Sequence, residues 1–229
     1  MLSFKQLRQL MQIQGSGTLA VRTQFVSSFT RLHLSVHGHV ELVQSDAEKV
    51  VIEADDNLLE HVGVTNAGRT LYVTTEDKLR RPAYTQLHIT VYLRQIDHLD
   101  VASQGTVRCA NALLAPESLT VKIAAHGDTD LALETPKLLV KAAAHGNVTL
   151  RGRATEATLR TASHGNLDAS EFIAAHLSIR NAAHGNIRLY ATDTIAIQHV
   201  GHGYVHYAGP ARLTDVGAHG QGEVRHVIN

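Results

Sequence analysis

The sequence is poor in aromatic residues, proline and cysteine. Its 229 residues include no Trp, four Pro and one Cys, and aromatic residues make up only 4%. The single cysteine, Cys109, excludes an intrachain disulfide and any paired-cysteine metal or redox site. We expect Cys109 to be a small buried hydrophobic residue. Without aromatic bulk, the core must be built from Val, Leu, Ile and Ala, which suits repeated thin layers.

Net charge is also absent. The chain has 21 Lys and Arg against 21 Asp and Glu, so its formal net charge at pH 7 is zero. No overall field therefore attracts nucleic acid or an anionic membrane, and any electrostatic partner depends on charges gathered on one face. We expect no nucleic-acid partner.

Long apolar runs are missing near the start of the chain. Residues 1–14 are amphipathic, carry Lys5 and Arg8, and contain no stretch long enough for a signal-peptide core or a membrane span. We expect no transmembrane segment in this chain. The protein is then either cytoplasmic or exported with its signal already removed.

The sequence does contain a repeat. The dipeptide His-Gly recurs at separations of 19, 19, 20, 18 and 17 residues. Its copies start at His126, His145, His164, His184, His202 and His219, with an earlier copy at His37. Gln104-Gly105 fills the same slot without an imidazole. Such a period is typical of stacked units that bury a core only together.

Apolar residues alternate around each histidine. Positions seven and five before it, and three and five after it, are mostly apolar, as Leu138, Val140, Val148 and Leu150 are around His145. Period-2 alternation over short runs indicates half-buried strands, so each unit predicts one coil of two or three strands. The crossover rule for parallel strands then predicts an all-β, single-stranded, right-handed parallel β-helix.

We expect a single domain over residues 15–229, with regular His-Gly coils from about residue 117. Residues 17–107 show the same alternation with longer turns and are interpreted as irregular first coils. Residues 1–14 are a candidate cap for the open end of the solenoid. A helical turn is expected over residues 55–61 and a polar excursion over residues 76–84.

The same alternation places the histidines on the outer surface. The residue two before each histidine is mostly alanine, and the residue two after it is Asp or Asn in the four copies from His126 to His184. Four residues before it is a row of cations formed by Lys122, Lys141, Arg160 and Arg180. We expect the Asp and Asn column to form hydrogen bonds between coils. The glycines should permit a bend that a Cβ would obstruct.

The histidine column has three interpretations. Neutral imidazoles on successive coils can stack, which is a sufficient structural reason for them. A metal such as Zn, Ni or Cu could bridge neighbouring histidines, but no acidic or thiol ligand recurs, so adventitious capture is favoured and no cofactor is expected. His33, His37 and His39 form a separate small cluster of the same kind. Protonated rings would repel one another, so packing or association would change below about pH 6.

The cation row has two interpretations. It is either a solvated face or, beside the flat alanine strip and the histidines, a binding surface for an anionic polymer, a lipid headgroup or a partner protein. A surface glycan or protein, or a second copy of the chain, is therefore the expected partner.

Catalytic residues are not evident. Asp128, Asp130, Asp168 and Glu171 are scattered over turn and outward positions without repeated pairing. No Gly-x-Ser-x-Gly element marks a nucleophile. We expect no enzymatic activity, and a polysaccharide-processing enzyme is only the third hypothesis.

Two segments resemble the head GIN domain family of putative autotransporter adhesins. They are SSFTRLHLSVHGHVEL at residues 27–42 and VVIEADDNLL at residues 50–59, and the resemblance covers about residues 15–229. Where the family repeats a Ser-Gly-Ser-Gly-Asp type of element, this chain has Ala-Ala-His-Gly-Asn. The resemblance implies a β-helix of secreted or envelope-anchored bacterial proteins and supplies no catalytic residues. The leading hypothesis is a non-enzymatic envelope or extracellular adhesin or self-associating module, and the alternative is a metal-binding or pH-responsive histidine ladder.

Overall fold

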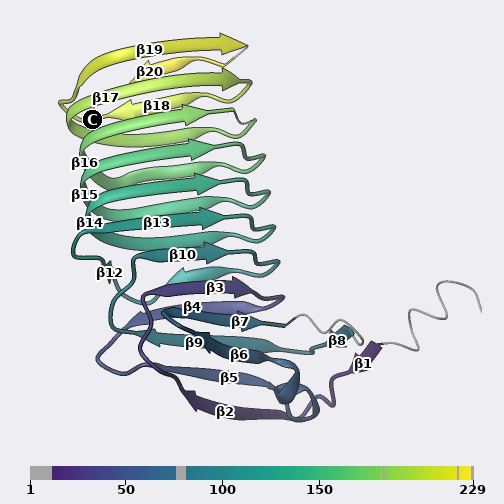
Figure 1. The fold of residues 1–229 in the computed structure, drawn as a ribbon. Helices are drawn as coiled ribbons and strands as arrows, with labels where there is room; N and C mark the ends of the chain where they lie inside the picture. The colour runs from purple at the N-terminus through teal and green to yellow at the C-terminus, as the bar shows by residue number, and fades with distance from the viewer. Residues whose placement is uncertain (1–11, 76–80, 183, 221, 228–229) are drawn as a thin grey trace, which may run out of the picture.

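The computed structural model describes residues 12–75, 81–182, 184–220 and 222–227. Over these ranges the protein is nearly all-β, and stacked parallel strands form a β-solenoid (Figure 1). The predicted fold class is confirmed. The one helix in the described ranges is the short 3-10 helix η1 (Asp56–His61), at the expected helical turn. No described helix is long and apolar enough to cross a membrane.

The regular coils are built from long strands that pair in parallel register with the coils on either side. Their bounds are β13 (Ser118–Ile123), β14 (Thr129–Ala142), β15 (Val148–Thr161), β16 (Leu167–Asn181), β17 (Ile187–Gly201), β18 (Val205–Ala208), β19 (Arg212–Gly220) and β20 (Val224–His226). Each long strand bends in its middle and contributes to two opposite sheets. β14, for example, pairs through Leu133 with β12 (Leu113–Leu114) and through Val140 with β13.

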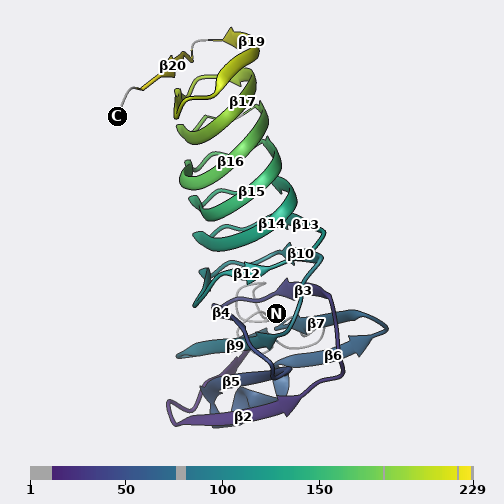
Figure 2. The same ribbon diagram turned by 90° about the vertical axis from the view of Figure 1, so that its left-hand side faces the viewer.

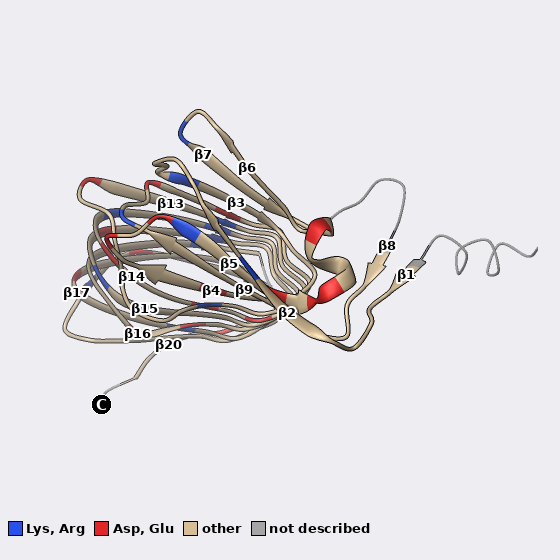
Figure 3. Cartoon of the chain, turned by 90° about the horizontal axis from the view of Figure 1, so that it is seen from below, with Lys and Arg blue, Asp and Glu red and all other residues tan. Residues whose placement is uncertain are grey.

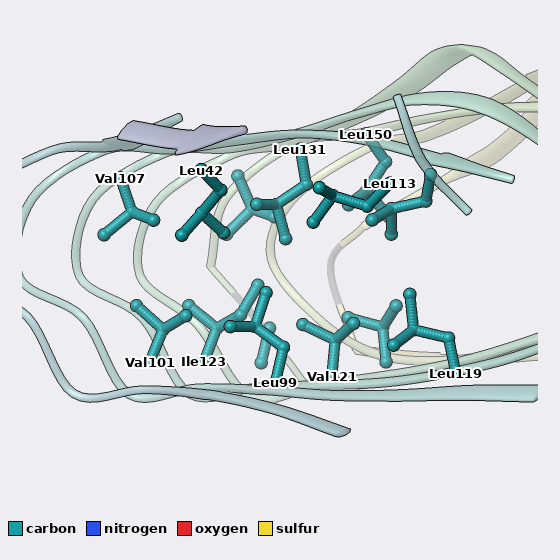
Figure 4. Close-up of a cluster of buried hydrophobic side chains, with 14 of the residues drawn as sticks. Leu42, Leu99, Val101, Val107, Leu113, Leu119, Val121, Ile123, Leu131 and Leu150 are labelled. Carbon is teal, nitrogen blue, oxygen red and sulfur yellow. The ribbon is translucent and has the colours of Figure 1, made fainter. Parts of the chain in front are cut away.

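The two sheets face each other across a narrow apolar core. Val101 and Val121 project from one sheet toward Val107 and Leu131 of the other (Figure 4). All four side chains are at most 1% exposed. Because positions an odd number of residues from the histidines face this core, the predicted alternation is confirmed in the regular coils. The stack therefore derives its stability from thin layers of Leu, Val, Ile and Ala, each covered by the next coil.

The first coils are stacked in an order that differs from the order of the chain. β3 (Arg31–Ser35) and β4 (His39–Gln44) pair in parallel with β10 (His98–Val101) and β11 (Val107–Cys109) on one side. On the other side they pair in parallel with β7 (Thr70–Thr74) and β9 (Leu87–Leu93). The chain thus leaves the coil of β3 and β4, builds the coil below it, and returns above it (Figure 1).

The irregularity of this region lies in three antiparallel strand pairings. β2 (Leu19–Phe25) pairs with β5 (Lys49–Asp55), β5 pairs with β9, and β6 (Gly63–Ala67) pairs with β7, all antiparallel. β6 and β7 are joined through Gly68, whose φ of +59° suits a tight hairpin turn. A turn this short can connect only antiparallel neighbours.

A separate parallel pair is formed by β1 (Gln12–Gln14) and β8 (Arg81–Ala83). Residues 1–11 of the expected cap and residues 76–80 of the expected polar excursion lie outside the described residues. The role of residues 1–14 as a cap stays a prediction.

Strand β2 lies at the N-terminal end of the solenoid (Figure 2), and its polar side chains close that end of the core. Arg22 Nη2 donates a hydrogen bond to the carbonyl oxygen of Val62 at 2.6 Å, and Gln24 Nε2 donates to that of Val64 at 3.1 Å. Both side chains lie on the same face of the sheet as the buried Ile52, because Arg22 pairs directly with it. Charged residues that point inward from an edge strand discourage further strand pairing. This end of the solenoid is therefore closed.

Asp55 holds three segments of this end together. Its carboxylate accepts hydrogen bonds from the backbone N–H of Gly17 at 2.8 Å and from the N–H and hydroxyl of Thr85 at 2.8 and 2.7 Å. The hydrogen bond from the Thr85 hydroxyl is the main cause that lowers the pKa of Asp55 below its ordinary value, against the opposing effect of burial. The ionised form is thus favoured by folding.

The lowered pKa of Asp55 gives a pH-dependent contribution to stability. Because the pKa in the folded state lies below the unfolded value of about 3.9, the contribution is fully present above that value and is lost as the pH falls through the folded pKa. We expect thermal unfolding of the native chain to be more sensitive to acidification below about pH 4 than that of Asp55→Asn. Equal slopes for both proteins would contradict this role.

Candidate functional site

The His-Gly turns bring successive coils into close backbone contact. A Cβ built on Gly146 would lie 2.3 Å from the carbonyl oxygen of Gly127, and one built on Gly165 would lie 2.1 Å from that of Gly146. These glycines do not have positive φ, so the close approach of the preceding coil is what excludes a side chain. The same contact links Gly38, Gly105, Gly127, Gly146, Gly165, Gly185, Gly203 and Gly222. The predicted obstruction of a Cβ is confirmed, and its source is the neighbouring coil.

Five of the predicted histidines form a continuous stack along the outside of this turn. They are His126, His145, His164, His184 and His202, and all are exposed. Their ring centroids are 4.7, 5.1, 5.3 and 5.2 Å apart, and neighbouring ring planes differ by only 2–6°. The predicted solvent-facing ladder is confirmed for these five residues.

His219 is the exception, and its placement in the ladder was wrong. It lies within β19, where it pairs with Val200 rather than His202. The glycine that stacks on Gly203 is Gly222, so the His-Gly copy at His219 is two residues out of register with the column. A register shift between Ile195 and Ala196 accompanies this change.

The early histidines occupy outward positions but do not converge. His37 occupies the position in its coil that corresponds to the stacked histidines, because Gly38 stacks under Gly105. In the next coil this position is occupied by Gln104, so His37 has no imidazole above it. His39 Nδ1 lies 2.7 Å from the Thr106 hydroxyl. His33 Nδ1 lies 3.3 Å from a carboxylate oxygen of Asp100.

The ladder is poorly arranged for a bridging metal ion. Zinc binds imidazole nitrogen at about 2.0–2.1 Å along the lone pair in the ring plane. Lone pairs on rings that are nearly parallel do not converge on one point, so a shared ion would require the rings to rotate out of the stack. Among the described residues, no three His, Cys, Asp or Glu side chains are grouped so that they could hold a metal.

The predicted cation row lies beside the ladder, separated from it by the alanine strip. Lys122, Lys141, Arg160 and Arg180 are direct neighbours in the parallel register, and all four are exposed. Neighbouring strands lie about 4.8 Å apart, so the row carries one positive charge per coil along the solenoid axis. Within the described ranges none of the four has an ion-pair or hydrogen-bond partner. We call this row, the alanine strip and the five stacked histidines the ladder face.

The other cations of β14 to β17 have acidic partners, whereas Arg212 of β19 has none among the described residues. Arg151 contacts both Asp130 and Glu171, and Arg153 pairs with Glu134 at 2.8 Å. Lys137 pairs with Glu156 at 3.7 Å and Arg188 with Asp168 at 3.4 Å. Both signs of charge are interspersed around the solenoid (Figure 3). The ladder face is therefore a local concentration of positive charge on a protein without net charge.

Burial, together with the positive charge of the cation row, lowers the pKa of a histidine at the N-terminal end of the row. Burial lowers the pKa of His98, and the positive charges of Lys122 and Arg31 lower it further. On the same strand Asp100 is the direct neighbour of Lys122 in the parallel register, so the row of cations ends beside a carboxylate at this end.

The Asp and Asn column supports the turn from the side opposite the alanine strip. The side-chain oxygen of Asp128 accepts the backbone N–H of Asn147 at 2.8 Å, Asn147 accepts that of Asn166 at 3.1 Å, and Asn166 accepts that of Asn186 at 2.8 Å. Asn186 in turn accepts the N–H of Tyr204 at 3.0 Å. The predicted structural role of this column is confirmed.

The carboxylates and the cysteine show no sign of catalytic use. Burial would raise the pKa of Asp168, but hydrogen bonds from Ser170 and the charge of Arg188 outweigh it, so that the pKa lies below its ordinary value. A general acid requires the opposite shift. Burial raises the pKa of the Cys109 thiol to about 12, and Cys109 packs against the hydrophobic core. Cys109 is partly buried, so the predicted burial is confirmed in part, and its raised pKa disfavours the reactive thiolate.

Comparison with known proteins gives the family. The model of the family described as "putative auto-transporter adhesin, head GIN domain" matches residues 28–211. The chain belongs to this head GIN domain family. No curated protein matches the sequence.

Solved structures with the same fold come from Bacteroides and Parabacteroides species. A putative adhesin from Bacteroides fragilis has a TM-score of 0.86 and 24% identity, covering 94% of this chain and 100% of its own. A putative lipid binding protein from Parabacteroides distasonis has a TM-score of 0.69 and 19% identity, covering 94% and 99%. A putative adhesin from the same species has a TM-score of 0.68 and 18% identity, covering 94% and 100%. These likenesses show that the same β-solenoid fold spans nearly the whole chain.

Proposed function

We propose that this head GIN domain protein is a non-enzymatic surface or extracellular adhesin whose ladder face binds a linear anionic glycan along the solenoid axis. The observation that carries the proposal is the unpaired row of Lys122, Lys141, Arg160 and Arg180, because the other cations of β14 to β17 all have an acidic partner. The family and the adhesins among the structural neighbours support the general class of function.

The shape of the face favours a linear ligand. The row is one residue wide and flanked by alanines that leave room for a chain to lie against the sheet. The exposed imidazoles beyond them can donate hydrogen bonds to hydroxyl or carboxylate groups. A polymer with regularly spaced anions can contact several coils at once, and its affinity then increases with its length.

A neutralised variant tests this proposal. Replacing Lys122, Lys141, Arg160 and Arg180 with Ser should lower affinity for an anionic polysaccharide such as a polyuronate at least tenfold, because four exposed charges near the ligand are lost. The matched control replaces Lys137, Arg151, Arg153 and Arg188 with Ser, which removes the same total charge elsewhere. Equal loss in both variants, or no loss in the first, would contradict a site at the ladder face.

The ladder itself gives a pH-dependent alternative that stays a prediction. Protonated rings at a separation near 5 Å would repel by about 0.8 kcal/mol per pair in bulk water. Packing or association would then change below about pH 6. Circular dichroism and light scattering that remain constant between pH 8 and pH 5 would eliminate this alternative.

A further inference from the structure

The C-terminal end of the solenoid leaves core residues uncovered. In β19, Leu213 pairs with Ile195 and Val216 pairs with Ile197, so these side chains continue the inner face of the stack. Ile195 and Ile197 are fully buried, whereas Leu213 is 38% and Val216 is 51% exposed. Among the described strands, β19 pairs only with β17 and β20 only with β18. The last coil therefore presents both an apolar inner surface and a free strand edge (Figure 1).

We infer that two copies of this chain associate through their C-terminal ends. Solenoids need a cover at each end, and an uncovered apolar surface with a free edge is an interaction site. β19 contains neither Lys nor Pro, the residues that usually prevent edge pairing. A covering partner must offer an equivalent edge and an equivalent apolar surface.

The opposite end of the molecule offers a strand edge in β2 but no equivalent apolar surface. Arg22 and Gln24 point inward across that end and are bonded to Val62 and Val64. β2 exposes Val21 and Phe25 as well, at 63% and 79%, but these lie on its outer face because the alternate residue Arg22 pairs with the buried Ile52. Head-to-tail stacking would place the core of one copy against a polar cap. Of the two described ends of a second copy, only the C-terminal end has both a free strand edge and an apolar inner surface to cover the C-terminal end of the first.

The charges of the last coil are compatible with self-pairing. It carries Arg212, Asp215, Glu223 and Arg225, two of each sign. Glu223 and Arg225 are paired at 2.8 Å, and Asp215 accepts a hydrogen bond from Gln198 at 2.6 Å. A neutral edge does not repel an identical one. A two-fold axis perpendicular to the strands would pair β19 with the β19 of the second copy in antiparallel fashion, which closes the assembly at a dimer.

This arrangement has a consequence for the ladder face. Antiparallel pairing of β19 with its copy joins the two sheets edge to edge, so their outer faces become continuous. The two cation rows then lie on one side of the dimer. A long anionic chain could contact both, although dimer formation itself does not depend on the proposed glycan site.

The test is the oligomeric state of the full chain by sedimentation equilibrium. We expect a monomer–dimer equilibrium and at least a tenfold higher dissociation constant for Val216→Lys. Val21→Lys on β2 is the matched control, since it places the same charge on a similarly exposed valine at the other end, and it should leave the dissociation constant unchanged. Hydrogen exchange of the native chain provides a second readout, with the amides of β19 exchanging more slowly as concentration rises and those of β2 unaffected.

Three results would overturn the inference. The first is a native chain that remains monomeric at all concentrations, with exchange of β19 independent of concentration. The second is a loss of association in Val21→Lys equal to that in Val216→Lys. The third is growth of open-ended species beyond the dimer, which would indicate head-to-tail stacking.

Discussion

Gly165→Ala should destabilise the solenoid by about 3 kcal/mol, at the upper end of the usual cost of overpacking a close contact. The new Cβ would lie 2.1 Å from the carbonyl oxygen of Gly146, a backbone atom that cannot move without displacing the coil below. Separating these two coils also weakens the hydrogen bond from the N–H of Asn166 to the Asn147 side chain, which joins the same two turns. Urea unfolding monitored by circular dichroism measures the change.

The matched control for this substitution is Gly217→Ala. Its Cβ would approach Oε1 of Gln198 at 2.3 Å, but this atom is the far end of a flexible side chain whose amide donates an exposed hydrogen bond to Asp215. The cost should stay within about 0.5 kcal/mol, as for ordinary surface substitutions. If both variants lose the same stability, the close stacking of the glycine column is not what requires glycine.

Phe172→Ala should cost about 3–5 kcal/mol, because it removes a buried aromatic side chain and leaves a cavity. Phe172 is 1% exposed and is among the largest fully buried side chains. Neighbouring side chains in the core are held by their own coils, so the sheets cannot collapse far into the space.

The next residue in the chain gives the control. Ile173 is 50% exposed, and Ile173→Ala should cost less than about 1 kcal/mol, the range of strand propensities. Both variants are compared by denaturant midpoint at constant slope. A smaller loss of stability for Phe172→Ala than for Ile173→Ala would mean that Ile173, and not Phe172, faces the core.

The regular coils could be predicted from the sequence because two independent signals agree there. The His-Gly period locates the turn, and the apolar alternation around it states which side chains face inward. Leu150 is buried and Lys141 is exposed for that reason. The outward position of the cation row follows from the same parity. Its lack of acidic partners depends on which residues of neighbouring coils lie side by side, and this could be seen only in the structure.

The parity rule did not predict that some inward positions would be polar. Thr161, Asn181 and His199 occupy one inner column near the C-terminal end, and all three are buried. The Thr161 hydroxyl bonds to Asn181 Oδ1, and Asn181 Nδ2 lies 2.8 Å from His199 Nδ1. Buried polar groups are tolerated when they are hydrogen-bonded to one another. Such pairing across coils can be found only once the register is known.

The first coils and the last one could not be fully predicted. The order of β3, β7 and β10 in the stack depends on long-range pairing that no local pattern encodes. The hairpin of β6 and β7 could have been recognised from Gly68, because a glycine between two short alternating runs is a turn signal. The placement of His219 failed because a chance His-Gly copy outweighed Gly222, whose spacing of 19 residues from Gly203 continues the true period.

The most direct test of the ladder face as a binding site is lysine acetylation of the native chain, read by mass spectrometry with and without a saturating anionic glycan. Lys122 and Lys141 should be protected by the glycan, whereas Lys49 and Lys137, which lie away from the cation row, should react equally in both samples. Protection of Lys137 that equals or exceeds that of Lys122 and Lys141 would contradict the proposed site.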